Sequence, residues 1–166
     1  MIKAAIMGYG TVGSGVAEVL DVNRVSIAKR AGDEITVKYV LDLRDFPGEP
    51  VEKKIVHDYR IIADDPEIQI VETMGGVEPA YTFVRTMLEA GKHVTTSNKA
   101  LVAAKGAELI ALAKEKNVNF MFEASVGGGI PIIRPLNSSL TADEIEEITG
   151  IVNGTTNYMM TKMSED

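Results

Sequence analysis

The feature that most constrains the fold is a glycine-rich turn directly behind an apolar segment near the N-terminus. Residues 2–7 form the apolar run Ile-Lys-Ala-Ala-Ile-Met, and residues 8–13 read Gly-Tyr-Gly-Thr-Val-Gly. A strand followed by G-x-G-x-x-G and a helix is the arrangement with which a chain holds the pyrophosphate of a dinucleotide. The pattern therefore predicts a strand–turn–helix unit that binds NAD or NADP, rather than an ordinary structural turn.

Each position of this turn has a physical task. Gly8 permits the tight turn, Gly10 removes the side chain where backbone approaches phosphate, and Gly13 lets the helix pack closely on the strand. Thr11 and Val12 open the helix, whose free N–H groups and positive dipole end attract an anion. We expect all five of these residues to bind the cofactor.

Strand-like and helix-like segments alternate along the first 130 residues. The first helix is expected over 11–29, with a buried face formed by Val12, Val16, Val19 and Leu20. Further helices are expected over 79–91 and 103–116, and strands over 35–43, 55–56, 68–73, 93–96 and 119–124. This alternation predicts an α/β fold with a Rossmann-type, doubly wound parallel sheet. Ligands bind such sheets at the carboxyl ends of the strands.

Composition excludes several classes of protein. A length of 166 residues suits a domain of ordinary size, and a hydrophobic content of 45% indicates a globular chain. No apolar run in the sequence reaches the ~18 residues of a membrane span. A net charge of −7 argues against nucleic acid as a partner. The chain has no cysteine, which excludes dehydrogenases that use a catalytic Cys and fits a cytoplasmic location.

An acidic and a basic residue follow the second expected strand. Asp42 stands where an acid accepts hydrogen bonds from the adenine ribose hydroxyls, which favours NAD. Arg44 stands two residues further on, where it would meet a 2′-phosphate and favour NADP. A solvated ion pair at a strand end is the alternative interpretation, and the choice between NAD and NADP stays open.

Lys99 is the best-placed candidate for acid–base chemistry. It follows Thr-Thr-Ser-Asn at the carboxyl end of a strand, so its ammonium group would enter the cleft. Burial there would lower its pKa and let it polarise an oxygen or exchange protons. The alternative is a helix-start lysine that points into water. His93 opens a strand and is interpreted as structural, and His57 lies in a polar loop and is interpreted as solvated.

Three successive glycines follow Glu123. They let the backbone over 127–129 fold tightly and turn its carbonyl groups inward. One carboxylate with several carbonyls is a hard-oxygen set suited to a cation such as Na⁺, K⁺ or Ca²⁺. A flexible hinge between domains explains the glycines equally well, and the two interpretations are compatible.

The pattern changes after residue 130. Residues 131–140 are expected to be helical and broken by Pro135, and residues 144–152 alternate acidic and apolar residues like a strand with one wet face. We therefore predict a dinucleotide-binding domain over 1–130 and the start of an α+β substrate and dimerisation domain over 131–166, whose remainder is missing. The exposed apolar residues over 145–152 and the Met-rich tail predict self-association.

Several of these motifs together resemble homoserine dehydrogenase, and the match covers the whole chain, or roughly the first half of that enzyme. The resemblance rests on Gly8–Gly15, Glu72–Gly76, Thr96–Ala100, Glu123–Pro131 and Asn153–Tyr158. It implies NAD(P)-dependent interconversion of L-aspartate 4-semialdehyde and L-homoserine, on the route to threonine and methionine. It also implies a small-molecule substrate and a homodimer in the full-length enzyme.

The resemblance further assigns roles to individual residues. It places Lys99 between nicotinamide and substrate as the catalytic residue. It extends the cofactor site to Met74, Gly75 and Gly76. The family's site for a monovalent cation, Na⁺ or K⁺, is matched by Glu123, Val126, Gly128 and Ile130. The lip of the substrate pocket is matched by Gly154, Thr155 and Thr156.

The sequence also departs from the family. The later helix that carries the substrate-binding acids and the proposed proton-donating lysine has no counterpart. Leu41 stands where many members have Arg, which weakens an NADP-only assignment. Two alternatives therefore stay open: an NAD(P)-binding module without catalytic activity in these 166 residues, and a related Rossmann dehydrogenase that acts on another small alcohol.

Overall fold

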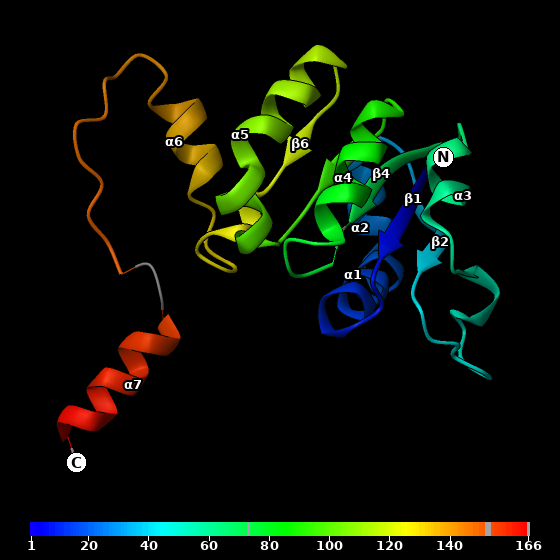
Figure 1. Cartoon of the computed structure of the whole chain (residues 1–166), viewed down its shortest axis with the longest axis horizontal. Coiled ribbons are helices and arrows are strands. Elements are labelled where there is room, and N and C mark those ends of the chain that lie inside the picture. The colour runs from blue at the N-terminus through cyan, green and yellow to red at the C-terminus, as the bar shows by residue number, and fades with distance from the viewer. Residues whose placement is uncertain (73, 152–153, 166) are drawn as a thin grey trace.

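The computed structural model describes residues 1–72, 74–151 and 154–165. Its centre is a six-stranded sheet with the order β3-β2-β1-β4-β5-β6, in which each pair of neighbouring strands is parallel (Figure 1). The strands are β1 (Ile2–Met7), β2 (Ile35–Leu41), β3 (Ile55–Val56), β4 (Ile68–Glu72), β5 (His93–Thr95) and β6 (Phe120–Met121). The predicted doubly wound parallel sheet is therefore confirmed.

Strand order reverses at the β1–β4 boundary, because the chain builds outward to β3 and then crosses back to β4. Right-handed crossovers on either side of this boundary place α1 and α4 on opposite faces of the sheet. The helices are α1 (Thr11–Val22), α2 (Arg24–Ala31), α3 (Tyr59–Asp64), α4 (Ala80–Glu89), α5 (Lys99–Glu115), α6 (Ile133–Ser139) and α7 (Gly154–Glu165).

Alternate residues of β1 enter two different cores. Ala5 and Met7 belong to the larger core, to which α3, α4 and α5 contribute buried side chains. Ile6 belongs to a smaller core with Val40 and Val51 on the face covered by α1. Because both faces of the sheet are covered, β1 is apolar along most of its length rather than strictly alternating.

The first helix is shorter and more exposed than predicted. It ends at Val22, and α2 follows after Asn23. Val16 packs against the smaller core, but Val12 and Val19 are 54% and 51% exposed. The predicted buried face is therefore wrong at these two valines. Val12 lies in the first turn of α1, where it lines an open cleft, and Val19 faces solvent.

Other elements differ from the predictions at their ends. β2 stops at Leu41, and β6 is two residues long and is followed by the 3₁₀ turn η2 (Glu123–Ser125). The helix predicted to begin at residue 103 begins at Lys99, because the Asn98 side chain caps its first turn. Residue 73, which was predicted to end β4, lies outside the described residues.

The part of the chain beyond η2 differs most from the prediction. α6 contains Pro135 in its first turn, where no helical hydrogen bond needs the missing N–H, so the helix is not broken there. Residues 144–151 are exposed and form no strand; residue 152 lies outside the described residues. A strand requires a neighbouring strand for its backbone hydrogen bonds, and Figure 1 shows this segment apart from the sheet.

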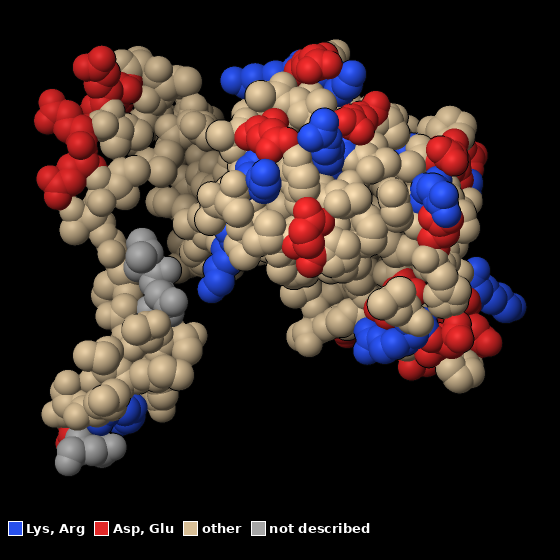
Figure 2. Space-filling view, viewed as in Figure 1, with Lys and Arg blue, Asp and Glu red and all other residues tan. Residues whose placement is uncertain are grey.

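The surface carries both signs of charge. Figure 2 shows Lys and Arg interspersed with Asp and Glu over the sheet-and-helix body, and acidic side chains gathered on the segment between α6 and α7. That segment contains Asp143, Glu144, Glu146 and Glu147. Within the described ranges, no helix has both the length and the apolar character needed to cross a membrane.

Candidate functional site

A cleft of about 470 Å³ lies at the carboxyl edge of the sheet, where the strand order reverses. Three loops line it, and each follows one of the strands β1, β4 and β5. The lining residues are Gly8, Gly10, Thr11, Val12, Gly13, Met74, Gly75, Gly76, Ser97, Asn98, Lys99 and Ala100. The structure thus brings the glycine-rich turn, Gly75, Gly76 and Lys99 together, as their positions at strand ends predicted. It also places Met74 there, which only the resemblance had assigned to the cofactor site.

The turn after β1 has a shape that requires glycine at positions 8 and 13. Gly8 has a positive φ of 94°, and its N–H donates to the Leu41 carbonyl at 2.7 Å. A β-carbon on Gly13 would lie 1.8 Å from the carbonyl oxygen of Gly8. A β-carbon on Gly10 would meet nothing within 4 Å, so the space beside Gly10 is available to a ligand.

The N-terminal end of α1 faces this turn. Its N-cap is Gly10, which makes no side-chain capping bond, and the helix continues for 12 residues. The first-turn N–H groups and the helix dipole therefore leave a partial positive charge at the cleft. This arrangement suits a phosphate group.

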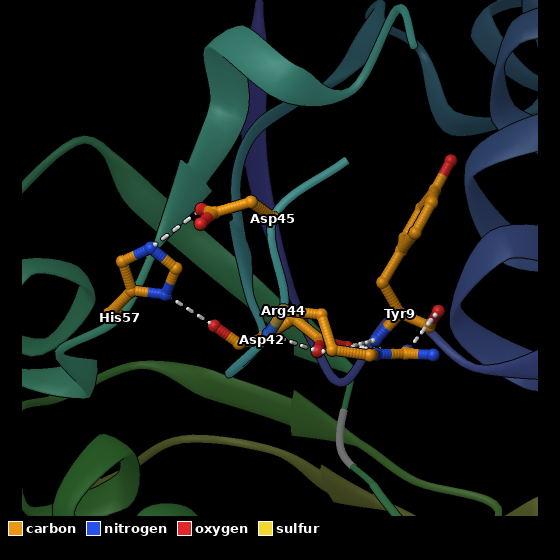
Figure 3. Close-up of polar contacts among 5 residues, drawn as sticks. All are labelled: Tyr9, Asp42, Arg44, Asp45 and His57. Carbon is orange, nitrogen blue, oxygen red and sulfur yellow. Dashed lines mark hydrogen bonds and ion pairs between the residues drawn. The ribbon is translucent and has the colours of Figure 1, made fainter. Parts of the chain in front are cut away.

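Asp42 and Arg44 form an ion pair beside the glycine-rich turn (Figure 3). Asp42 Oδ1 accepts hydrogen bonds from the backbone N–H and Nε of Arg44, at 3.0 and 2.9 Å. Asp42 Oδ2 accepts from the Tyr9 N–H at 2.8 Å and from Arg44 Nη2 at 3.0 Å. Arg44 Nη2 also donates to the Tyr9 carbonyl at 2.9 Å. The two side chains contact the turn through Tyr9 but are not among the residues that line the cleft.

The electrostatics of this pair favour the charged forms. The hydrogen bonds from the Arg44 side chain hold the pKa of Asp42 well below its usual range, despite partial burial. The same contact raises the pKa of Arg44. Both carboxylate oxygens of Asp42 are engaged, so a ribose hydroxyl would have to share or replace the contacts with Arg44.

His57 is exposed, as its interpretation as a solvated side chain expected, but it also makes two contacts beside this ion pair (Figure 3). Its Nδ1 lies 2.7 Å from the Asp42 carbonyl oxygen, and its Nε2 lies 3.1 Å from Asp45 Oδ1. These contacts attach the loop after β2 to the end of β3, although the side chain is 53% exposed. His93 is structural, because its Nδ1 accepts a hydrogen bond from the Asn119 N–H at 3.0 Å.

Lys99 is the first residue of α5 and lines the cleft, but its side chain is exposed rather than buried. The expected burial of its ammonium group is therefore not met in this structure, because α5 begins at the rim of the cleft. Ser97 and Asn98 line the cleft as well and were not singled out as site residues. Their position in the sequence could have identified them, since they directly precede Lys99 at the carboxyl end of the same strand.

Glu123 uses its carboxylate to hold a loop. Its Oε1 accepts hydrogen bonds from the N–H groups of Ile132 and Ile133 at 2.5 and 2.8 Å. Oε2 accepts from the Arg134 N–H at 2.8 Å. Desolvation raises the pKa of Glu123, but these backbone hydrogen bonds outweigh it and the net shift is downward. The carboxylate therefore connects η2 to the start of α6.

The intervening loop is tightly folded. Gly127 and Gly128 have positive φ values of 74° and 60°, and the Ile130 N–H donates to the Gly127 carbonyl at 3.1 Å. A β-carbon on Gly127 would lie 2.8 Å from the Ile130 carbonyl oxygen. The glycines thus serve the compact turn that the sequence predicted, and this loop follows β6 at the carboxyl edge.

Gly154, Thr155 and Thr156 lie in the first turn of α7. They are exposed and do not contribute to the lining of the cleft, and Figure 1 shows α7 apart from the sheet. The structure therefore does not bring these predicted substrate residues to the cofactor cleft. Asn153, which precedes them in the motif, lies outside the described residues.

Comparison with protein families gives two matches. Residues 8–123 match the family model described as the NAD-binding domain of homoserine dehydrogenase. Residues 131–166 match the model described as homoserine dehydrogenase. The first model alone covers more than half of the chain.

Comparison with individual proteins and solved structures also finds homoserine dehydrogenases. The chain is 41% identical over 174 aligned residues to homoserine dehydrogenase from Lactococcus lactis, covering 99% of this chain and 40% of that relative. The crystal structure of a homoserine dehydrogenase from Thiobacillus denitrificans superposes with a TM-score of 0.91 at 42% identity, over 99% of this chain and 39% of that one. A hyperthermophilic archaeal homoserine dehydrogenase in complex with NADPH gives a TM-score of 0.80 at 27% identity, over 99% and 56%. The chain thus spans about 40% of the length of the curated relative.

Proposed function

The chain belongs to the homoserine dehydrogenase family, and on that premise we propose that it supplies the cofactor-binding part of an enzyme that interconverts L-aspartate 4-semialdehyde and L-homoserine with NAD(P). The observation that carries this proposal is the single cleft shared by the glycine-rich turn, residues 74–76 and Lys99. A helix end suited to phosphate and a lysine in one cleft suit a nicotinamide-dependent reduction of a carbonyl, which needs a bound dinucleotide and a proton donor for the oxygen.

Each part of the cleft has a proposed task. The N–H groups of Gly10 to Gly13 bind the pyrophosphate, and residues 74–76 form the wall beside the nicotinamide half. A bound nicotinamide supplies or accepts the hydride. Lys99 lies at the rim, where its ammonium group would donate a hydrogen bond to the substrate oxygen and stabilise the charge that develops there.

Asp42 and Arg44 are proposed to govern the choice between NAD and NADP. Asp42 is the acceptor for the ribose hydroxyls of NAD, and Arg44 is the partner for the 2′-phosphate of NADP. Their mutual hydrogen bonds keep both groups charged at the outer end of the glycine-rich turn. The related archaeal enzyme was solved with NADPH, which supports the use of NADP within the family.

A monovalent cation, Na⁺ or K⁺, is proposed to bind at the loop after β6, through oxygens of Glu123, Val126, Gly128 and Ile130. The chemistry of the residues fits, because carbonyl oxygens are hard ligands suited to such ions. The Glu123 carboxylate already accepts three backbone hydrogen bonds, so its side chain would mainly hold the loop in shape. The carbonyl groups would then provide most of the ligands.

The remaining assignments concern the second half of the chain. We infer a domain boundary near residue 130. This is supported by the family comparison, in which the first matched region ends at residue 123 and the second begins at residue 131. Residues 154–156 are proposed to join the substrate pocket in the whole enzyme. A homodimer is proposed for that enzyme, and the exposed Ile148, Ile151 and Met163 support an apolar contact in this part of the chain.

Absorbance at 340 nm tests the activity directly. The chain is incubated with L-homoserine, with NAD⁺ and NADP⁺ in turn, and with NaCl or KCl. Reduction that requires homoserine and is lost in Lys99→Met, but kept in the matched control Lys114→Met, supports the proposal. Absence of reduction together with measurable NADH binding favours a cofactor-binding module, and reduction with other small alcohols but not homoserine favours a related dehydrogenase.

A further inference from the structure

Asn98 is a buried polar side chain that connects two loops of the cleft. It is 6% exposed, and its Nδ2 donates to the Met74 carbonyl at 2.8 Å and to the Gly76 carbonyl. Its Oδ1 accepts the Leu101 N–H at 3.0 Å and so caps α5. One amide group thus joins the loop after β4 to the first turn of the helix that begins with Lys99.

The connection continues to the glycine-rich turn. A β-carbon on Gly8 would lie 2.9 Å from the β-carbon of Met74, so Met74 packs directly against this turn. Asn98, Met74 and Gly8 therefore form a continuous series of contacts across the cleft. Lys99 follows Asn98 in the chain, so the distance from Lys99 to the turn depends on the hydrogen bonds of Asn98.

We propose that Asn98 is a positioning residue that sets the width of the nicotinamide half of the cleft. This inference rests on the proposed assignment of the cleft to NAD(P). The adenine half is held by a separate set of hydrogen bonds among Asp42, Arg44 and Tyr9. Loss of the Asn98 amide should therefore weaken the binding of a whole dinucleotide more than the binding of its adenine part.

The side-chain chemistry of asparagine explains why this residue type suits the position. Asn98 offers two N–H donors for two carbonyl groups and one oxygen acceptor for the helix N–H. Serine keeps an acceptor that caps a helix but is too short to reach both carbonyl groups. Aspartate also keeps the cap, but it places a carboxylate against two carbonyl oxygens that have lost their donor.

Calorimetric titration separates the two halves of the cleft. NADH and ADP are titrated into the wild-type chain, Asn98→Ser, Asn98→Asp and the control Asn137→Ser, which makes the same change at an exposed position on α6. We expect the dissociation constant for NADH to rise about tenfold in Asn98→Ser and further in Asn98→Asp, with ADP affinity within about twofold of wild type. The control should bind both ligands like wild type.

Three outcomes would overturn the inference. NADH affinity within about twofold of wild type in both variants would show that the Asn98 amide does not shape the cleft. Equal losses for NADH and ADP, with a lower melting temperature, would show a general effect on folding. If the wild type binds ADP but not NADH, the cofactor assignment itself fails, and the inference fails with it. Should Asn98→Ser not fold, Asn98→Asp decides between these results.

Discussion

The two edges of the same sheet differ in what fills them. At the carboxyl edge, glycines and small polar residues follow β1, β4 and β5 and leave a cleft of about 470 Å³. Near the amino ends of β4 and β5, charged side chains fill the space between the turns. We call Lys38, Asp65, Glu67 and Lys92 the amino-edge cluster.

The amino-edge cluster is closed by its own contacts. Lys92 is 4% exposed, and its Nζ donates to the carbonyl groups of Asp65 at 2.6 Å and Ile68 at 3.3 Å. Lys38 is the extra residue of β2 at a register shift, and its Nζ lies 2.6 Å from Asp65 Oδ2 and also contacts Glu67. Burial lowers the pKa of Lys92, whereas the hydrogen bond from Lys38 lowers the pKa of Asp65 to about 2.

This difference indicates that the residues that stabilise the fold and the residues that face a ligand lie at opposite edges of the sheet. Where side chains satisfy one another, a substitution removes contacts of the folded protein and changes the free energy of unfolding. Where backbone groups and open space face a cleft, a substitution changes the surface offered to a ligand. Variants at the amino edge should therefore lower stability and leave cofactor affinity unchanged. Variants at the cleft should lower cofactor affinity and leave stability unchanged.

The largest effect on stability is expected for Lys92→Met. The substitution keeps the apolar stem but leaves two carbonyl groups without their donor, which should cost about 2 kcal/mol of unfolding free energy. NADH affinity should stay at the wild-type value. Denaturant titration and NADH titration measure the two quantities, and Lys114→Met on the exposed side of α5 is the control. A loss of NADH affinity without a loss of stability would contradict the claim that the amino-edge cluster acts on stability alone.

A smaller effect, on binding alone, is expected for Arg44→Ala. Removal of the guanidinium should weaken NADPH binding about tenfold and leave NADH binding equal or tighter, because Asp42 then has free acceptor sites. Arg60→Ala is a matched control, since Arg60 pairs with Asp58 two residues earlier in the same way. Parallel titrations with NADPH and NADH check the result. Equal losses for both cofactors would contradict the role given to Arg44.

The smallest effect is expected from the titration of Asp65. Its pKa in the folded state is about 2, below the ordinary value of 3.8, so its contribution to stability is fully present above about pH 4. That contribution should be lost as the pH falls from about 4 toward 2. The slope of unfolding free energy against pH in this range should be shallower in Asp65→Asn than in wild type. An identical slope in the two proteins would show that the Lys38–Asp65 contact contributes nothing.

The sequence was sufficient for the features that depend on local pattern. Alternating strands and helices specified the parallel sheet, and glycine spacing specified the turn at Gly8 to Gly13. Placement at strand ends brought Gly76 and Lys99 into one cleft, whereas Met74 was assigned to the site only by the family resemblance. These features depend on residues that are close in the sequence and on the general topology of parallel sheets. Both can be recognised from one sequence.

Contacts between distant residues were not available from the pattern. The contacts of His57 with Asp42 and Asp45, and of Glu123 with the start of α6, depend on how loops fold back. The exposure of Val12 depends on its place at the cleft, which helical spacing alone does not show. The alternation of acidic and apolar residues over 144–151 predicted a strand, but the pattern could not show whether a neighbouring strand is present to pair with it.

The most direct test of the separation between edges is NADH binding by Gly10→Ala, measured with its melting temperature. A β-carbon at Gly10 meets no protein atom within 4 Å, and its φ of −87° is accessible to alanine, so the fold should be unaffected. The methyl group would occupy the space proposed for the pyrophosphate. We predict an unchanged melting temperature and an NADH affinity at least about tenfold lower. Wild-type affinity for NADH in Gly10→Ala would contradict the assignment of the cleft.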